Sequence, residues 1–189
     1  MATGRNRARK PIGRSRGDEP AEGARELSPE EARKRVMAEA IRLLASRARS
    51  ESQLRERLIE KERASPEIVE ECIARLKELG YIDDVKFAES YASSRARTKL
   101  LGRSRLAREL SERKLSPEVI DEALDAVFDE QTEESLIDRA IQKRIRTHGR
   151  PVDRAGASRL FAHLAHLGFE YDLILRKIRS LKMSDELEG

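Results

Sequence analysis

The sequence predicts an all-α protein in which three tandem three-helix repeats form an elongated, curved array. Apolar residues recur at the helical spacings i, i+3 and i+4, and no window shows sustained period-2 alternation. A leucine pair recurs at intervals of 52 and then 54 residues, as Leu54/Leu58, Leu106/Leu110 and Leu160/Leu164. Charged residues (39%) are as frequent as hydrophobic ones (38%), which favours small units that bury a narrow stripe over one large core.

Helix boundaries follow from short local signals. The tripeptide Ser-Pro-Glu occurs at Ser28, Ser65 and Ser116, where serine caps a helix and proline takes its first position. Ser50 with Gln53 predicts a capping box, and Gly80 and Gly168 predict left-handed helix ends. The expected first helices span 30–47, 84–99 and 131–147, the second 51–62, 103–113 and 153–167, and the third 66–79, 117–128 and 170–181.

The repeats predict four regions along the chain. Residues 1–27 carry seven Lys and Arg against four Asp and Glu, a net charge of +3, with almost no bulky apolar side chain. Such a segment cannot offset its ordering entropy, so a disordered basic tail is expected there. The three repeats are expected over residues 28–82, 83–129 and 130–189.

Several classes of protein are disfavoured. No run of 18 apolar residues exists, and the basic N-terminus lacks the apolar segment of a secretory signal. The single cysteine, Cys72, permits no internal disulfide and fits a reducing cytoplasm. We therefore expect a cytoplasmic monomer without membrane contact, cofactor or metal.

Charge is strongly segregated along the chain. No acidic residue lies between Glu89 and Glu109, and a second basic run lies between Asp138 and Asp153. Because helix-dipole effects are worth only about 0.3–1 kcal/mol per cation, they do not account for such runs, and an anionic partner is predicted. A run without cations follows Lys114, and its acids could set register on a protein–DNA filament. The predicted binding face comprises Arg95, Arg97, Lys99, Arg103, Arg105, Arg108, Lys143, Arg144 and Arg146, with a weaker first-repeat version at Arg42, Arg47 and Arg49.

Several segments resemble the RecX family. Gly80-Tyr81-Ile82-Asp83-Asp84, followed by Phe87, Ala88 and Tyr91, is similar to its most recognisable motif. The pattern around Arg49–Leu58 resembles the first repeat, Gly102–Leu110 the second and Arg159–Phe169 the third, so the likeness spans about residues 36–181. The family usually has Lys-Gly at the end of the second helix, where this chain has Lys61-Glu62 and Lys114-Leu115, and it often has proline where Arg103 stands.

The motif itself has a structural interpretation. Gly80 should end a helix, Tyr81 and Ile82 should pack across the joint, and Asp83 or Asp84 should cap the next helix. The resemblance, in turn, implies a non-enzymatic protein that lies in the groove of the RecA filament on DNA. There it would restrain filament growth, ATP turnover, strand exchange and repressor cleavage, in recombination, repair and the SOS response.

Three alternatives stay open. A stand-alone protein could bind single- or double-stranded DNA without sequence preference, since Asn and Gln are too scarce for base readout. An enzyme is disfavoured, because His163 and His166 lack further ligands and no HExxH, CxxC or phosphate loop occurs. His163 is therefore interpreted as an ordinary outward-facing histidine. The third alternative is a helical scaffold with an unrelated partner.

Overall fold

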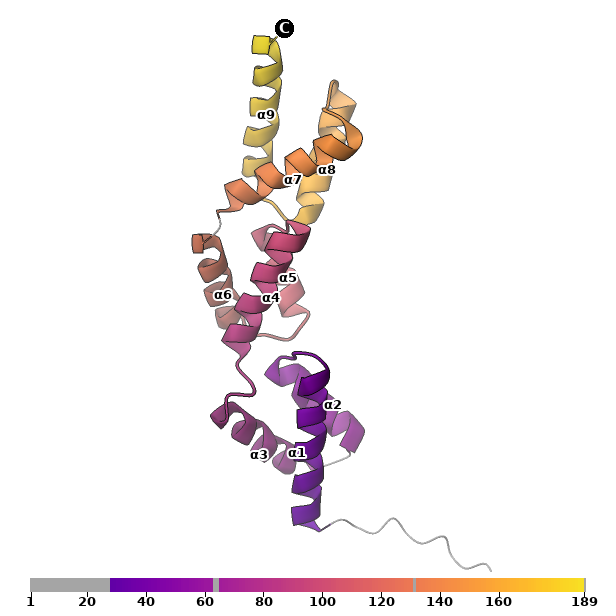
Figure 1. The fold of residues 1–189 in the computed structure, drawn as a ribbon, viewed down its shortest axis with the longest axis vertical. Coiled ribbons are helices and arrows are strands. Elements are labelled where there is room, and N and C mark those ends of the chain that lie inside the picture. The colour runs from indigo at the N-terminus through magenta and orange to yellow at the C-terminus, as the bar shows by residue number, and fades with distance from the viewer. Residues whose placement is uncertain (1–27, 63–64, 131, 189) are drawn as a thin grey trace, which may run out of the picture.

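The computed structural model describes residues 28–62, 65–130 and 132–188, so the predicted tail lies outside the described residues. Throughout that part the chain forms α-helices joined by turns, without a strand, and the predicted fold class is confirmed. The three-helix units follow one another along an elongated rod, with repeat 1 (α1–α3) at one end and repeat 3 (α7–α9) at the other (Figure 1).

The helix bounds agree closely with those expected from the sequence. Repeat 1 comprises α1 (Pro29–Ser46), α2 (Glu51–Glu62) and α3 (Pro66–Glu78); repeat 2 comprises α4 (Asp84–Lys99), α5 (Arg103–Ser111) and α6 (Pro117–Glu130); repeat 3 comprises α7 (Glu133–His148), α8 (Arg154–Leu167) and α9 (Tyr171–Glu188). The main differences are an earlier end for α5 and a longer α9. No helix in the described ranges is long and apolar enough to cross a bilayer.

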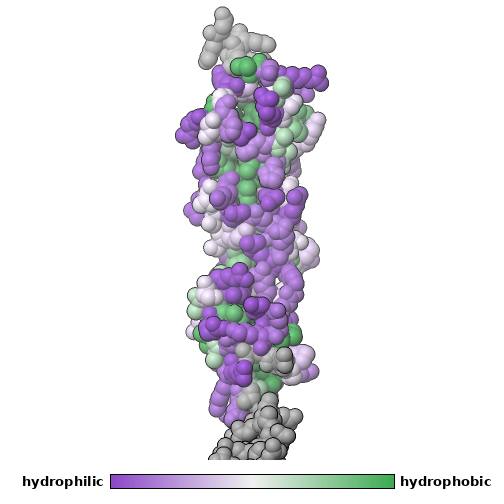
Figure 2. Space-filling view, turned by 90° about the vertical axis from the view of Figure 1, so that its right-hand side faces the viewer, coloured by the Kyte–Doolittle hydropathy of each residue, from purple (hydrophilic) through white to green (hydrophobic). Residues whose placement is uncertain are grey.

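The apolar interior consists of two separate clusters. Leu54, Leu58 and Leu76 belong to a core confined to repeat 1. The second core runs without interruption through repeats 2 and 3, from Ala88 to Ile178. On the side of the rod shown in Figure 2, hydrophilic side chains cover most of the surface, and apolar side chains are exposed in narrow bands and small patches. Repeats 2 and 3 thus form one packed body, whereas repeat 1 has its own interior.

The joint between repeats 1 and 2 is correspondingly polar. The buried Ser50 hydroxyl donates to the Arg113 carbonyl (2.6 Å) and accepts from the Gln53 amide (3.3 Å), so half of the predicted capping box is present. The Glu51 amide donates to the Asp84 carboxylate at 2.8 Å. These bonds satisfy the open end of α2 with groups from repeat 2, and they fix how the two repeats meet.

The Gly-Tyr-Ile-Asp-Asp motif lies in this joint. Gly80 has φ +72°, as a left-handed helix end requires, and Asp83 caps α4 by accepting from the Lys86 amide at 3.0 Å. Ile82 is buried, but Tyr81 is 62% exposed, so the prediction that both pack across the joint is wrong for the tyrosine. The Tyr81 amide closes the end of α3 by donating to the Leu76 carbonyl (2.9 Å), so the contribution of this residue to the joint is through its backbone.

Lys114 provides a test of the backbone at the same joint. It has φ +61°, a left-handed conformation that costs a side-chain-bearing residue about 1–2 kcal/mol. We expect Lys114→Gly to raise the free energy of unfolding by about 1 kcal/mol relative to Lys114→Ala. Both variants remove the exposed Lys114–Glu56 ion pair, so alanine is the matched control. Urea denaturation measures the difference, and equal stability of the two variants would contradict the prediction.

Candidate nucleic-acid and filament interface

Several of the nine predicted cations form ion pairs with acids of the same chain. Arg95 and Arg105 converge on Glu109. The Arg95 guanidinium donates to both carboxylate oxygens (2.9 and 2.8 Å), and Arg105 Nε lies 3.4 Å from Oε1. The Tyr91 hydroxyl donates to Oε2 at 2.6 Å. We call Glu109, Tyr91, Arg95 and Arg105 the Glu109 cluster.

The Glu109 carboxylate is a buried charge with three donor side chains. Its side chain is only 8% exposed. The hydrogen bonds from Arg95, Tyr91 and Arg105, against the cost of burial, lower its pKa from 4.5 to about 2. Arg113 adds a further cation, stacked 3.9 Å from the centroid of the Tyr91 ring. Arg95 and Arg105 therefore stabilise repeat 2, and part of their charge is neutralised by Glu109.

Arg103 is also engaged within repeat 2. Its Nη2 atom donates to Asp125 of α6 at 2.7 Å, and its guanidinium lies 6.0 Å from the centroid of the Phe128 ring. Its backbone amide donates to Glu133 at the start of α7 (3.0 Å). The residue consequently ties α5 to α6 and to the following repeat.

Acidic side chains on the outward side of α6 form part of the predicted acidic surface. Of these, Asp125 pairs with Arg103, and the others have no ion pair within the described segments. The members of this acidic face are Glu118, Asp121, Glu122, Asp125 and Asp129. It belongs to repeat 2, so both signs of charge are present in the middle of the rod.

Five of the predicted cations are exposed and form no ion pair with any residue that the structure describes: Arg97, Lys99, Arg108, Lys143 and Arg146. They point in different directions. Arg146 lines a groove between α7 and α9, beside Lys177 and Leu181. Lys143 lies on the side of α7 that faces α8 and the end of α4. The third-repeat cations are thus divided between two sides of one helix.

Lys99, Lys143 and Arg144 do come together, at the joint between repeats 2 and 3. They line one pocket of 240 Å³, with His148 from α7 and His163 from α8. We call Lys99, Lys143 and Arg144 the junction cluster. These three of the nine predicted cations come from two different repeats and line the same pocket.

The histidines complete this pocket. Arg144 Nη1 lies 3.0 Å from His148 Nε2, and His148 Nδ1 lies 2.6 Å from the Thr147 hydroxyl. If Arg144 donates, His148 accepts through Nε2 and carries its proton on Nδ1. Burial, followed by the charges of Arg144 and the other nearby cationic groups, lowers the pKa of His163. The interpretation of His163 as an outward-facing surface residue is therefore wrong, since the side chain is half-buried among cations.

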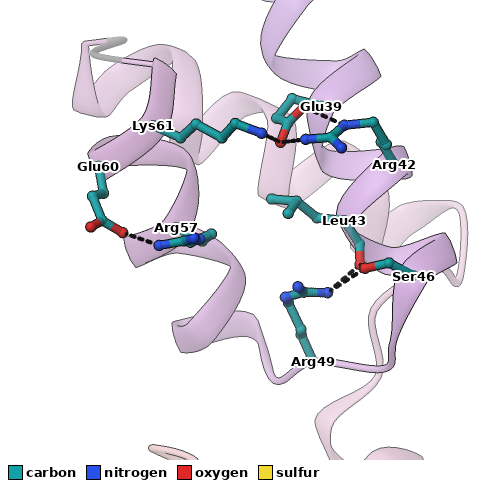
Figure 3. Close-up of polar contacts among 8 residues, drawn as sticks. All are labelled: Glu39, Arg42, Leu43, Ser46, Arg49, Arg57, Glu60 and Lys61. Atoms are coloured by element: carbon teal, nitrogen blue, oxygen red, sulfur yellow. Dashed lines mark hydrogen bonds and ion pairs between the residues drawn. The ribbon is translucent and has the colours of Figure 1, made fainter.

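Arg47 is exposed, whereas most other cations in this part of repeat 1 are engaged with groups of the same repeat (Figure 3). Arg42 and Lys61 both point at Glu39, with distances of 2.7 and 2.6 Å to its Oε1. Arg49 donates to the Leu43 carbonyl at the end of α1, and Arg57 pairs with Glu60 at 2.5 Å. This group consequently offers an anionic partner less free charge than the junction cluster does.

The described residues show no arrangement typical of a metal site or a nucleophile. No group of three His, Cys, Asp or Glu side chains in the described ranges is placed to hold a metal ion. Cys72 is buried in the core of repeat 1, with its Sγ 3.9 Å from Met37 Sδ, and burial raises the pKa of the thiol. A neutral buried thiol is a poor nucleophile.

Comparison with known proteins identifies the family. Residues 37–76 match the model of the RecX first three-helix domain, and residues 83–124 match the RecX second three-helix domain. A Regulatory protein RecX from Deinococcus radiodurans is 34% identical over 188 residues, covering 97% of this chain and 88% of the relative. The chain belongs to the RecX family. The resemblance found in the sequence is thereby confirmed.

Other RecX proteins agree with this assignment. The Regulatory protein RecX from Listeria welshimeri is 29% identical over 79% of this chain, which spans 54% of that relative's length. The crystal structure of RecX from Lactobacillus salivarius superimposes with a TM-score of 0.71 at 19% identity, over 82% of this chain and 99% of that one. That likeness concerns the fold. The family carries the name of a regulatory protein.

The structural roles of Glu109 and His163 are not predicted by the sequence. Glu109 marks the end of a basic run and belongs to the segment that resembles the second repeat, although its spacing of four from Arg105 on one helix indicates an ion pair. Its bond to Arg95 and the partial burial of His163 depend on how neighbouring helices pack. No local signal in the sequence predicts either.

Proposed function

We propose that this chain is a non-enzymatic, cytoplasmic regulator that binds RecA recombinase filaments on DNA and mainly inhibits the recombinase in recombination, repair and the SOS response. The observation that carries the proposal is the junction cluster, in a chain of a family named for regulation. Lys99 comes from repeat 2 and Lys143 from repeat 3, and neither is neutralised by a described acid.

The joint suits such a role because its geometry is fixed by backbone contacts. The Gly102 amide donates to the Leu167 carbonyl at 2.9 Å, and the Ser104 amide donates to the Gly168 carbonyl at 3.3 Å. These backbone bonds fix the spacing of the two repeats that carry Lys99 and Lys143, so the joint needs no rearrangement to present both to one partner. The acidic face of α6 would complement basic surfaces of the filament and set the register of docking.

The test compares two pairs of exposed cations. In the double variant Lys99→Gln/Lys143→Gln, we expect about tenfold weaker co-sedimentation with recombinase filaments on single-stranded DNA, because both lysines would contact anionic groups. Inhibition of recombinase ATPase activity should weaken in parallel. The matched control is Arg97→Gln/Arg108→Gln, which removes the same charge from exposed positions outside the pocket. Equal effects of the two double variants would contradict a role for the junction cluster.

A second candidate function is stand-alone, non-specific DNA binding. The distribution of the free cations over several sides of the rod favours it, because a filament groove would contact them unequally. Filter binding to bare duplex across a salt series separates the two functions. Tight, steeply salt-dependent binding without recombinase supports the second candidate, and weak binding to bare duplex with strong filament binding supports the first.

A further inference from the structure

Repeats 2 and 3 place different groups at equivalent positions between their first and second helices. Glu109 and His163 each precede the second leucine of the repeated pair, Leu110 in α5 and Leu164 in α8. Arg95 and Arg144 each lie four residues before the end of α4 and α7. The arginine therefore recurs in both repeats, whereas its carboxylate partner is replaced by an imidazole.

Because of this replacement, repeat 3 has no carboxylate at the position that Glu109 takes in repeat 2. In repeat 2 the Glu109 carboxylate accepts hydrogen bonds from Tyr91, Arg95 and Arg105. In repeat 3 the corresponding space is the 240 Å³ pocket, and no carboxylate is among its described lining residues. Its polar lining is Lys99, Lys143, Arg144, Thr147, His148 and His163.

We propose that this pocket binds one phosphate group, seated where repeat 2 holds the Glu109 carboxylate. The donors suit that chemistry: the planar Arg144 guanidinium can bind two oxygens at once, and the two lysine ammonium groups add point charges. His148, held by Thr147, orients the guanidinium. The inference rests on the proposed function, which it deepens by assigning the junction cluster to a phosphodiester of the DNA strand; free phosphate is the other source of the same chemistry.

The pocket also predicts how binding depends on pH. His163 faces Lys99 from α4 and Lys143, Arg144 and His148 from α7, and His166 lies on its own helix. Burial and, after it, the charges of Arg144 and the other nearby groups disfavour a protonated His163, and its pKa is lowered. A bound phosphate reverses the sign of the local field, so protonation of His163 and phosphate binding should each favour the other.

The first experiment follows the His163 ring protons by NMR in the full chain. Inorganic phosphate is titrated at constant ionic strength, with chloride as the balancing anion. We expect a saturable change in chemical shift and a rise in the His163 pKa by about one pH unit or more. A change that never saturates, or that chloride alone reproduces, overturns the proposal.

Variants separate binding from folding, with calorimetric titration of phosphate as the readout. Lys143→Gln should weaken binding about tenfold, and the control Lys34→Gln, at an exposed lysine of repeat 1, should leave it unchanged. His163→Glu restores the arrangement of repeat 2: its carboxylate should occupy the pocket, abolish phosphate binding and keep the melting temperature at or above that of the parent chain. Phosphate binding as tight as in the parent chain, in either His163→Glu or Lys143→Gln, overturns the proposal.

A short oligothymidylate distinguishes the two phosphate sources. Displacement of inorganic phosphate by the oligonucleotide assigns the pocket to a DNA phosphodiester, whereas saturable phosphate binding without displacement assigns it to free phosphate. Filament co-sedimentation is measured on the same variants. A chain that sediments with filaments but binds no phosphate refutes the pocket alone, and a chain that binds phosphate but not filaments refutes the proposed function alone.

Discussion

Replacing Gly168 by alanine should lower the free energy of unfolding by about 3 kcal/mol or more. Gly168 ends α8 with φ +92°, which alone costs alanine about 1–2 kcal/mol. A Cβ atom there would also fall well inside van der Waals contact of Arg105 Cβ and the Arg105 backbone nitrogen. Because backbone atoms cannot rotate away, the joint between repeats 2 and 3 would have to open.

Gly80 supplies the matched control for this prediction. It follows α3 with φ +72° and the same pattern of helix-end hydrogen bonds as Gly168, but a Cβ atom there would meet nothing within 4 Å. Gly80→Ala should therefore show only the conformational cost, about 1–2 kcal/mol. Urea denaturation of both variants gives the difference, which measures the contact between the repeats. If the two alanines cost the same, Gly168 is required only for its backbone angle.

The close approach at Gly168 also links the Glu109 cluster of repeat 2 to the pocket in repeat 3. Arg105 touches Gly168 through its backbone and Glu109 through its guanidinium. Opening the joint should therefore disturb the Glu109 cluster of repeat 2 as well as the pocket in repeat 3. The position of the junction cluster depends on this contact, since Lys99 precedes the joint and Lys143 follows it.

The helices were predictable because their signals are local. Ser28 and Ser65 cap α1 and α3 as their Ser-Pro-Glu tripeptides predict, and Gly80 and Gly168 take the left-handed angles expected of helix ends. The spacing of apolar residues predicted which leucines are buried, because one face of each helix packs against its neighbours. Lys114 shows the limit of this approach: it has a left-handed backbone in the turn that follows α5, although nothing in its side chain predicts this conformation.

The site was predictable only in part, because charge counts do not say which side of a helix a cation occupies. Arg95 and Lys99 lie one turn apart on α4, yet the first is committed to Glu109 and the second lines the pocket. The difference depends on which neighbouring helix each side chain reaches. Sequence patterns locate the basic runs, whereas the crossing of α4, α7 and α8 selects three of nine cations for the junction cluster.

The second large effect concerns Glu109, and Glu109→Gln should lower the free energy of unfolding at pH 7 by about 3 kcal/mol. The carboxylate is 8% exposed, and its pKa falls from 4.5 to about 2 on folding. Lowering a pKa by one pH unit corresponds to about 1.4 kcal/mol, and removing one partner from a buried ion pair leaves the other charges uncompensated. Glu78→Gln is the control, because Glu78 pairs with Arg75 where both side chains are more than half exposed; it should cost less than about 1 kcal/mol.

The pH dependence identifies the cause of this loss. Because folding depresses the pKa of Glu109, its contribution is fully present above pH 4.5 and disappears as the pH falls toward 2. The parent chain and Glu109→Gln should therefore differ by about 3 kcal/mol at pH 7 and converge near pH 2. Subtracting one stability profile from the other removes the titration of other paired acids such as Glu39. A difference that stays constant from pH 7 to 2 would mean that the glutamine disturbs packing, and that the carboxylate charge does not stabilise the cluster.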